Sequence, residues 1–216
     1  MLDGEGTMRV RYAAIIGVWP VLIGLSGLVF AEEPPIKGLP GWHVQEGKAE
    51  CWKIDHGIIF SAPGGGFLTL DKQFGDFHLM LEYRMKAGGN SGVGVHYPPG
   101  GHPSTAGIEI QILDDDAPEH RNIKPTQFNG SIYKHVAPLR RAAKPLGEWN
   151  KMEITCKDPL LIVKLNGAEI QRVNLDDYPN TEGNGIPLSK LPRKGCIGLQ
   201  SHGEAVEFRN VHIKAL

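Results

Sequence analysis

The sequence predicts an all-β protein built as an antiparallel β-sandwich. The first observation is strict alternation: along Ile108–Leu113, aliphatic and polar side chains take turns, which is the period of a strand with one buried face. The second is the high content of turn-forming residues, because the 216 residues include 28 Gly and 16 Pro, which end the apolar runs at short intervals. The third is the lack of a segment with clear helical periodicity. Many short strands joined by turns are typical of a sandwich.

Strand patterns follow one another from Gly41 onward. Between them lie turn signals: the 63–66 run of Pro and Gly, the flexible 86–90 link and the hairpin pair Asn166-Gly167. We expect a single domain over residues 41–216. Its strands are expected over 42–44, 51–54, 57–60, 67–70, 77–85, 91–97, 108–113, 149–156, 160–165, 169–173, 195–203 and 206–211.

Two longer segments interrupt this pattern. Residues 114–144 are polar and broken by prolines, and residues 176–194 form a second loop. Long loops within a compact domain often bind ligands. We therefore expect the first loop to contribute to a site, with Tyr133 as the residue that contacts a bound molecule.

The N-terminus resembles a secretory signal. Arg9 and Arg11 precede an apolar run over 13–30, and small residues permit cleavage after residue 31. An uncleaved membrane anchor is the alternative, because the run approaches the length that spans a bilayer. We expect a signal peptide over 1–31, a Pro-rich linker over 32–40, no stable membrane insertion after cleavage, and export to the periplasm or the cell exterior.

Charge and cysteine content exclude two classes of site. The formal net charge is −1, and no basic run is interleaved with aromatic residues, so we expect no nucleic-acid partner. Cys51, Cys156 and Cys196 are far apart and form no C-x-x-C pair, which leaves a zinc knuckle unsupported. Three buried thiols and one disulfide with one free thiol remain equal alternatives.

A polar face follows from the alternation. Glu109 and Gln111 share one face of their strand, opposite the isoleucines. Near the C-terminus, Gln200 and His202 alternate with aliphatic residues in the same way, and Gly198 leaves space beside them. A strand with one aliphatic row and one row of carboxylate, amide and imidazole groups is how a sandwich builds a binding face.

The chain resembles the family of 3-keto-disaccharide hydrolase domains over roughly residues 41–216. Many motifs in a fixed order carry this resemblance, which makes it more specific than any single motif. They are Gly75-Asp76-Phe77, Glu82-Tyr83-Arg84, Asn90-Ser91-Gly92-Val93, Gly107-x-Glu109-x-Gln111-x-x-Asp114, Gly147-Glu148-Trp149-Asn150, Leu165-Asn166-Gly167, Gly198-Leu199-Gln200-Ser201-His202-Gly203 and Phe208-Arg209-Asn210-Val211.

The resemblance implies a concanavalin A-like jelly roll and the cleavage of glycosides that carry a ketone at C3 of the sugar. The ketone acidifies the C2 proton, so a base can remove it and the C1 aglycone leaves, after which water adds back. Such an enzyme needs a base, a group that stabilises the enolate and an acid. An upstream sugar 3-dehydrogenase would supply the substrate, and no cofactor is required.

The candidate catalytic residues are expected on one concave face. Glu109 or His96 would be the base, His96 standing where the family usually has Arg or a similar residue. Arg84 would stabilise the enolate, and Gln200 and His202 would bind hydroxyls or supply the acid. A structural alternative pairs Glu109 with Arg84 or another Arg as a satisfied carboxylate.

Further candidates would bind the sugar itself. Tyr97, beside two prolines, is the expected sugar platform, and Asn90 is either a ligand group or a turn residue. Arg209 would bind a ketone or enolate oxygen or pair with a carboxylate. The substrate-binding candidates are Gln111, Gln200, Asn90, Tyr97, Tyr133 and Arg209.

Three further alternatives concern the reaction mechanism, a metal site and the class of protein. Glu109, Gln111 and Asp114 have the spacing of a laminarinase-like glycosidase signature, but Gln111 is not a carboxylate, so we expect no ordinary retaining mechanism, which needs two carboxyls about 5 Å apart. Asp114 and Asp116 are weak candidates for a divalent metal site, with a solvated acidic turn as the alternative. The rival function is a non-catalytic carbohydrate-binding module or lectin.

Overall fold

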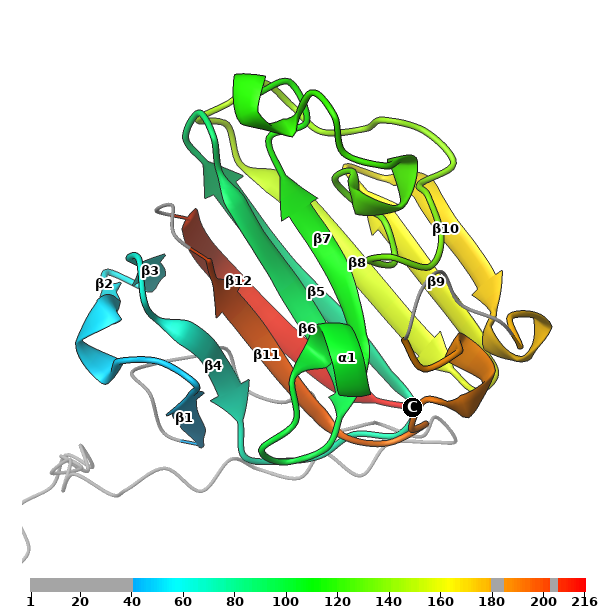
Figure 1. The fold of residues 1–216 in the computed structure, drawn as a ribbon. Coiled ribbons are helices and arrows are strands. Elements are labelled where there is room, and N and C mark those ends of the chain that lie inside the picture. The colour runs from blue at the N-terminus through cyan, green and yellow to red at the C-terminus, as the bar shows by residue number, and fades with distance from the viewer. Residues whose placement is uncertain (1–40, 180–184, 203–205) are drawn as a thin grey trace, which may run out of the picture.

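The computed structural model describes residues 41–179, 185–202 and 206–216, and they form two antiparallel sheets packed face to face (Figure 1). The predicted antiparallel sandwich is therefore confirmed. The signal peptide and linker predicted over 1–40 lie outside the described residues. Within the described ranges, no helix is long and apolar enough to cross a membrane.

The sheet nearer the viewer in Figure 1 is called the front sheet, and its strand order is β1-β4-β11-β6-β7. The long hairpin partners β6 and β7 lie at one edge, and β11 from the C-terminal part of the chain lies between β6 and β4. The strands are β1 (Trp42–Gln45), β4 (Gly66–Leu70), β6 (Asn90–Tyr97), β7 (Ile108–Leu113) and β11 (Cys196–Ser201).

The other sheet, called the back sheet, has the order β10-β9-β8-β5-β12-β3-β2. Its strands are β2 (Trp52–Asp55), β3 (Ile58–Ser61), β5 (Phe77–Met85), β8 (Asn150–Lys157), β9 (Leu160–Leu165), β10 (Ala168–Asn174) and β12 (Val206–Ala215). The helical elements are α1 (Pro103–Ala106) and the 3-10 turns η1 (Ala49–Cys51), η2 (Pro118–His120), η3 (Pro125–Gln127), η4 (Leu175–Asp177) and η5 (Leu188–Lys190).

The core fills the space between the sheets and follows the alternation in the sequence. On β7, Ile108, Ile110 and Ile112 are fully buried against the back sheet. On β5, every second residue from Phe77 to Met85 enters the same core, whereas the residues between them face outward. Because the period of a strand is two, burial of one row fixes the opposite row on the outer face.

The long loop after β7 closes one side of the sandwich. Its segment 130–136 runs along the free edge of β7, where the Gln111 N–H donates to Ser131 C=O at 3.0 Å and the Tyr133 N–H donates to Glu109 C=O at 2.9 Å. Further on, the Leu139 N–H donates to Ile170 C=O of β10 at 2.9 Å. The loop therefore covers the edge of the front sheet, as natural sheets commonly require, and brings polar residues beside Glu109.

The three cysteines are free thiols. Cys156 and Cys196 are buried, whereas Cys51 is partly exposed. The alternative with one disulfide is therefore wrong, because the described residues contain none. The alternative with three buried thiols holds for two of the three cysteines.

Candidate active site

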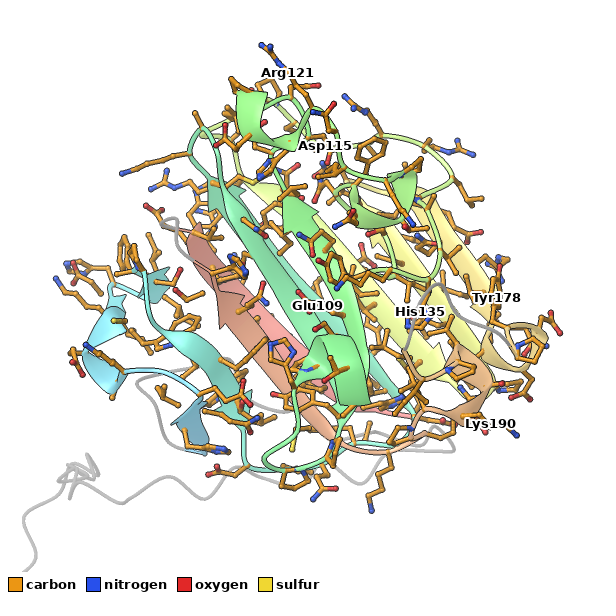
Figure 2. The ribbon with its side chains drawn as sticks, viewed as in Figure 1. Glu109, Asp115, Arg121, His135, Tyr178 and Lys190 are labelled. Atoms are coloured by element: carbon orange, nitrogen blue, oxygen red, sulfur yellow. The ribbon has the colours of Figure 1, made fainter. Side chains whose placement is uncertain are left out.

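The outer face of the front sheet carries the polar row predicted from the sequence. Glu109 and Gln111 of β7 and Gln200 of β11 all lie opposite the core residues of their strands. Figure 2 shows Glu109 in the middle of this face, above the short helix α1. All three side chains are nearly enclosed, with exposed fractions of 3%, 4% and 5%. The face is therefore a set of buried polar groups rather than an ordinary solvated surface.

Glu109 is a buried carboxyl with an unused oxygen. Its Oε2 atom has no hydrogen-bond partner among the described residues. Burial raises the pKa of Glu109 from 4.5 to about 7, while the charge of Lys134 and the amide of Gln200 act in the opposite direction. A buried polar atom without a partner is costly and uncommon, and together with a shifted pKa it marks a position where a ligand or a proton can bind.

Glycines of β6 allow the Glu109 side chain to lie across the sheet. A Cβ atom on Gly92 would stand 2.6 Å from Glu109 Oε1, closer than real contacts permit. Gly94 pairs with Glu109, and Gly198 pairs with Gly94, so the strand between β7 and β11 has no side chain here. Glu109 and Gln200 therefore meet over β6, and because Gln200 Oε1 has no partner among the described residues, its amide nitrogen is the atom that faces the carboxylate.

Lys134 is a site residue that the sequence did not single out. It lies in the turn between Ile132 and Val136, which pair with each other, and has a positive φ of 63°. Its Nζ is 5.0 Å from the ring centroid of Tyr133, and its charge favours the ionised form of Glu109. The only available signal was the long polar loop, which indicates a binding segment but not the residue that faces the strand.

A network of amides and an imidazole continues the site along the strands. Gln111 Nε2 donates to Asn90 Oδ1 at 3.0 Å, and Asn90 Nδ2 lies 3.5 Å from His202 Nδ1. His202 is exposed at the end of β11. The structure thus brings together three of the residues predicted to bind substrate or transfer a proton, and it uses Asn90 as a link between them rather than as a free turn residue.

A depression of about 290 Å³ opens beside Gln200 on the same face. It lies over β4 and β11, on the side of Gln200 opposite Glu109. Its lining residues are Glu46, Gly64, Gly66, Phe67, His102, Gln200, Ser201 and His202. Only Gln200 and His202 among them were singled out from the sequence, because the others, apart from Ser201 of β11, come from turns and from the neighbouring strand β4.

The grouping of His96 with Glu109 on one face is wrong. The pairing of β6 with β11 shifts register between Cys196 and Ile197, and His96 there has a φ of 55°. This β-bulge turns His96 inward, where its ring lies 5.4 Å from that of Phe77 and its Nε2 is 2.8 Å from Gly75 C=O. His96 is 2% exposed, and burial lowers its pKa.

The same bulge puts Tyr97 on the outer face, but not as a sugar platform. Tyr97 is fully buried, and its ring centroid is 6.4 Å from that of Phe67. Its hydroxyl donates to Thr69 Oγ1 at 2.8 Å and fills the space above Gly198. The ring forms part of the floor of the face and is closed to stacking.

Arg84 and Arg209 lie on the outer face of the back sheet, away from Glu109. The guanidinium of Arg84 pairs with Glu207, and Arg209 Nε pairs with Glu82 at 2.5 Å. The two guanidinium groups also contact the ring of Trp149, at 4.7 Å and 4.0 Å from its centroid. The expected role of Arg84 beside Glu109 is therefore excluded by the alternation of β5, and pairing with carboxylates is what both arginines do.

The aspartates after β7 organise a turn. Asp114 accepts hydrogen bonds from the Gly88 N–H at 2.9 Å and the Asp116 N–H at 3.3 Å. Asp116 in turn accepts from Arg141 Nη1 at 2.8 Å. Within the described ranges, no three or more His, Cys, Asp or Glu residues are grouped so that they could hold a metal ion. These contacts support the acidic-turn interpretation of Asp114 and Asp116.

Comparisons with known proteins agree with this architecture. A 3-keto-disaccharide hydrolase of Bacteroides thetaiotaomicron is 27% identical over 205 residues, covering 76% of this chain and 70% of that protein. A crystal structure of a candidate glycosyl hydrolase from Parabacteroides distasonis is 30% identical, with a TM-score of 0.71 over 81% of this chain and 99% of that one. A carbohydrate-binding module of Bacillus subtilis, 10% identical with a TM-score of 0.54 over 81% of this chain and 96% of that one, shares the fold.

The family itself is shown by a match along nearly the whole sequence. The 3-keto-alpha-glucoside-1,2-lyase-like domain matches residues 37–214, which include all of the strands described above except the last residue of β12. This chain belongs to the family of 3-keto-alpha-glucoside-1,2-lyase-like domains.

Proposed function

We propose that this protein cleaves glycosides whose sugar carries a ketone at C3, and that Glu109 is the base that removes the C2 proton. The observation that carries the proposal is the Glu109 carboxyl, which is buried, has an oxygen with no partner among the residues that the structure describes, and has a pKa raised to about 7. The name of the Bacteroides relative, a 3-keto-disaccharide hydrolase, supports the same substrate class.

The reaction proceeds in three balanced steps. Glu109 takes the C2 proton, and the electron pair of that C–H bond forms an enolate whose charge rests on the C3 oxygen. Return of the pair forms the C1–C2 double bond and breaks the bond from C1 to the aglycone oxygen, which takes up a proton. Water then adds its hydroxyl to C1 and a proton to C2, so that the overall result is hydrolysis.

A carboxyl with a pKa near 7 suits the first step. A general base is most effective when its pKa is close to the working pH, because it is then both ionised and strongly basic. An ordinary exposed Glu, with a pKa near 4.3, would be ionised but a much weaker base. The burial of Glu109, which has no paired Arg among the described residues, supplies the shift.

Lys134 is the group we assign to the enolate. A cation near the C3 oxygen would stabilise the negative charge that develops there. Lys134 lies on the loop that pairs with the strand of Glu109, and its charge already acts on that carboxyl. It takes the role that the sequence suggested for Arg84, which lies on the back sheet.

The remaining polar groups would hold the sugar. Gln111, Asn90 and His202 form a connected line of donors and acceptors, and Gln200 contacts Glu109 directly. A few polar groups that converge on a concave position are how sugar hydroxyls are oriented. Export through the N-terminal segment would place this reaction outside the cytoplasm, with a sugar 3-dehydrogenase supplying the ketone.

The test compares a 3-keto glycoside with its unoxidised parent, using the purified protein with and without a chelator. We expect aglycone release from the ketone alone, and its loss in Glu109→Gln. In deuterated water, the hydrolysed sugar should carry deuterium at C2, because the proton added there comes from solvent. Chelator sensitivity would add a divalent metal to the mechanism.

Two results would overturn the proposal. Equal release from the unoxidised parent would show that the C2 proton is not removed, because that compound has no ketone to acidify it. Release from neither compound, combined with measurable binding of a glycan, would establish the protein as a carbohydrate-binding module or lectin instead.

A further inference from the structure

We propose that the depression beside Gln200 is a leaving-group subsite that binds one sugar ring, and that His102 donates a hydrogen bond to that sugar. The inference rests on the proposed function, because it assigns the position of the aglycone relative to Glu109. It makes the natural substrate a disaccharide-like 3-keto glycoside rather than one with an apolar aglycone.

The orientation of the substrate follows from the two neighbours of C2. That carbon is bonded to C3, which carries the ketone, and to C1, which carries the leaving group. The charge of Lys134 lies on the loop that covers the outer edge of β7, so the C3 oxygen is placed there. C1 and its aglycone must then extend in the other direction, across β6 toward β11 and β4, where the depression opens.

Gln200 connects the base with the depression. The side chain is 5% exposed, its amide nitrogen faces the Glu109 carboxylate, and its Oε1 has no hydrogen-bond partner among the described residues. Because a buried carbonyl oxygen without a donor is unfavourable, this atom calls for a donor such as a sugar hydroxyl. The unpartnered oxygen belongs to a residue that lines the depression.

His102 offers the complementary donor. Its Nδ1 accepts a hydrogen bond from the Ser104 backbone N–H at 3.2 Å, and Ser104 Oγ lies 2.9 Å from the same atom. Since a backbone N–H can only donate, Nδ1 carries no proton, and the neutral ring carries its proton on Nε2. The ring of Phe67 contacts that of His102 edge to face, with centroids 4.9 Å apart, and fixes its plane.

The size and polarity of the depression fit a single sugar. A volume of about 290 Å³ lies at the lower end of the range for small-molecule pockets, which suits one ring. The wall offers an acceptor at Gln200, a donor at His102 and a carboxylate at Glu46. A sugar hydroxyl both donates and accepts, whereas an aryl or alkyl aglycone would leave these groups unpaired.

The test uses His102→Asn, because Asn keeps a side-chain acceptor for the Ser104 N–H but lacks the distal ring donor. Values of kcat/KM are compared for a 3-keto disaccharide and the matching methyl 3-keto glycoside. We expect the preference for the disaccharide to fall about tenfold, which corresponds to one lost hydrogen bond, while the methyl glycoside is cleaved as before. His78→Ala, on the outer face of the back sheet, is the control and should leave both values unchanged.

A binding measurement separates this inference from the proposed function. Calorimetry with the unoxidised disaccharide needs no turnover, and the affinity is expected to be about tenfold weaker in His102→Asn. If neither ketone is cleaved but this loss of affinity is found, the sugar subsite stands and the catalytic proposal fails. If both ketones are cleaved and His102→Asn leaves the preference and the affinity unchanged, the subsite is refuted and the catalytic proposal stands.

Discussion

The two outer faces of the sandwich hold carboxylates in opposite conditions. On the back sheet, Glu82 pairs with Arg209, and Glu153 pairs with Lys151 at 2.9 Å, an interaction that lowers the pKa of Glu153. On the front sheet, Glu109 is more deeply buried and, within the part of the chain that the structure describes, has no paired Arg and keeps one oxygen without a partner, so its pKa is raised to about 7.

The difference shows what makes a carboxylate chemically useful in this fold. Strand alternation alone puts a Glu on the outside of either sheet. A neighbouring cation on a solvated face satisfies the charge and holds the group as an anion of low basicity. A covering loop and glycine neighbours instead leave Glu109 enclosed and basic, a state that costs stability and that active sites commonly contain.

The largest expected effect comes from removing the buried carboxylate of Glu109, and removal of a paired carboxylate on the back sheet is the control. Glu109→Gln should lower kcat/KM for a 3-keto glycoside about 10²–10⁴-fold, the usual contribution of a general base. The matched change Glu207→Gln, on the back sheet, should alter kcat/KM by less than about threefold, since it breaks a partly buried ion pair on the face opposite Glu109. Steady-state kinetics measure both, and similar losses in the two variants would erase the distinction between the faces.

Displacing Glu109 without removing it should have the next largest effect. A methyl group at Gly92→Ala would stand 2.6 Å from Glu109 Oε1 and 2.9 Å from its Cγ, so the carboxylate must move. We expect kcat/KM to fall about 10–100-fold, because small misplacements of a catalytic group are costly. Gly75→Ala, whose Cβ would meet only Arg193 C=O at 3.9 Å, is the control for glycine replacement. Full activity in Gly92→Ala would mean that the position of the carboxylate is not critical.

Glu109→Gln, which is expected to lower activity, should raise the stability of the fold at high pH. Because the folded-state pKa of Glu109 is raised above 4.5 to about 7, its contribution to stability is fully present at low pH and is lost as the pH rises through 7. Glu109→Gln should therefore match the wild type near pH 4 and exceed it by about 1–3 kcal/mol at pH 8. Urea unfolding at the two pH values measures this difference. The same difference at both would show that ionisation of Glu109 costs the fold nothing.

The polar row of the site could be predicted from the sequence because it depends on local alternation. Ile108, Ile110 and Ile112 are buried and Glu109 and Gln111 lie opposite them, as the pattern of β7 requires. Gln200 follows the same rule on β11. Period two is a property of the backbone, so it holds wherever a strand is regular.

The rest of the site depends on features that are not local. One extra residue in the pairing of β6 with β11 turned His96 into the core and brought Tyr97 to the outer face. The cation beside Glu109 comes from a residue in the middle of a loop, whose path is set by pairing with the β7 edge. His102 lines the depression next to α1, which lies over Gly94 with Pro103 in contact with it. No spacing in the sequence encodes these contacts.

The pH dependence of kcat/KM should respond to the loss of a lysine near Glu109 but not to the loss of a lysine on the back sheet. With Glu109 as base, kcat/KM should fall about tenfold per unit below pH 7, where the carboxyl is protonated. Lys134→Met removes a charge that lowers the pKa of Glu109, so this acid limb should move up by about half a pH unit. Lys151→Met, whose partner Glu153 lies on the back sheet, should leave the limb in place. If the acid limb of the pH profile does not move in Lys134→Met, the charge of Lys134 does not act on Glu109 and Lys134 is not part of the site.

The smallest effect is expected at the paired arginines of the back sheet. Arg209 contacts Glu82 and the ring of Trp149, and both contacts are partly exposed to solvent. Arg209→Ala should therefore lower the free energy of unfolding by about 0.5–1 kcal/mol, less at high salt, and change kcat/KM by less than about twofold. Urea midpoints at two salt concentrations measure the change in stability, and steady-state kinetics at a pH above the pKa of Glu109 measure the change in activity. The exposed pair of Arg172 with Glu169 provides the control, since Arg172→Ala removes an ion pair without an aromatic contact. A loss of activity above about tenfold in Arg209→Ala alone would return this arginine to the role in sugar binding that the sequence suggested, and would mean that the paired face, too, takes part in the reaction.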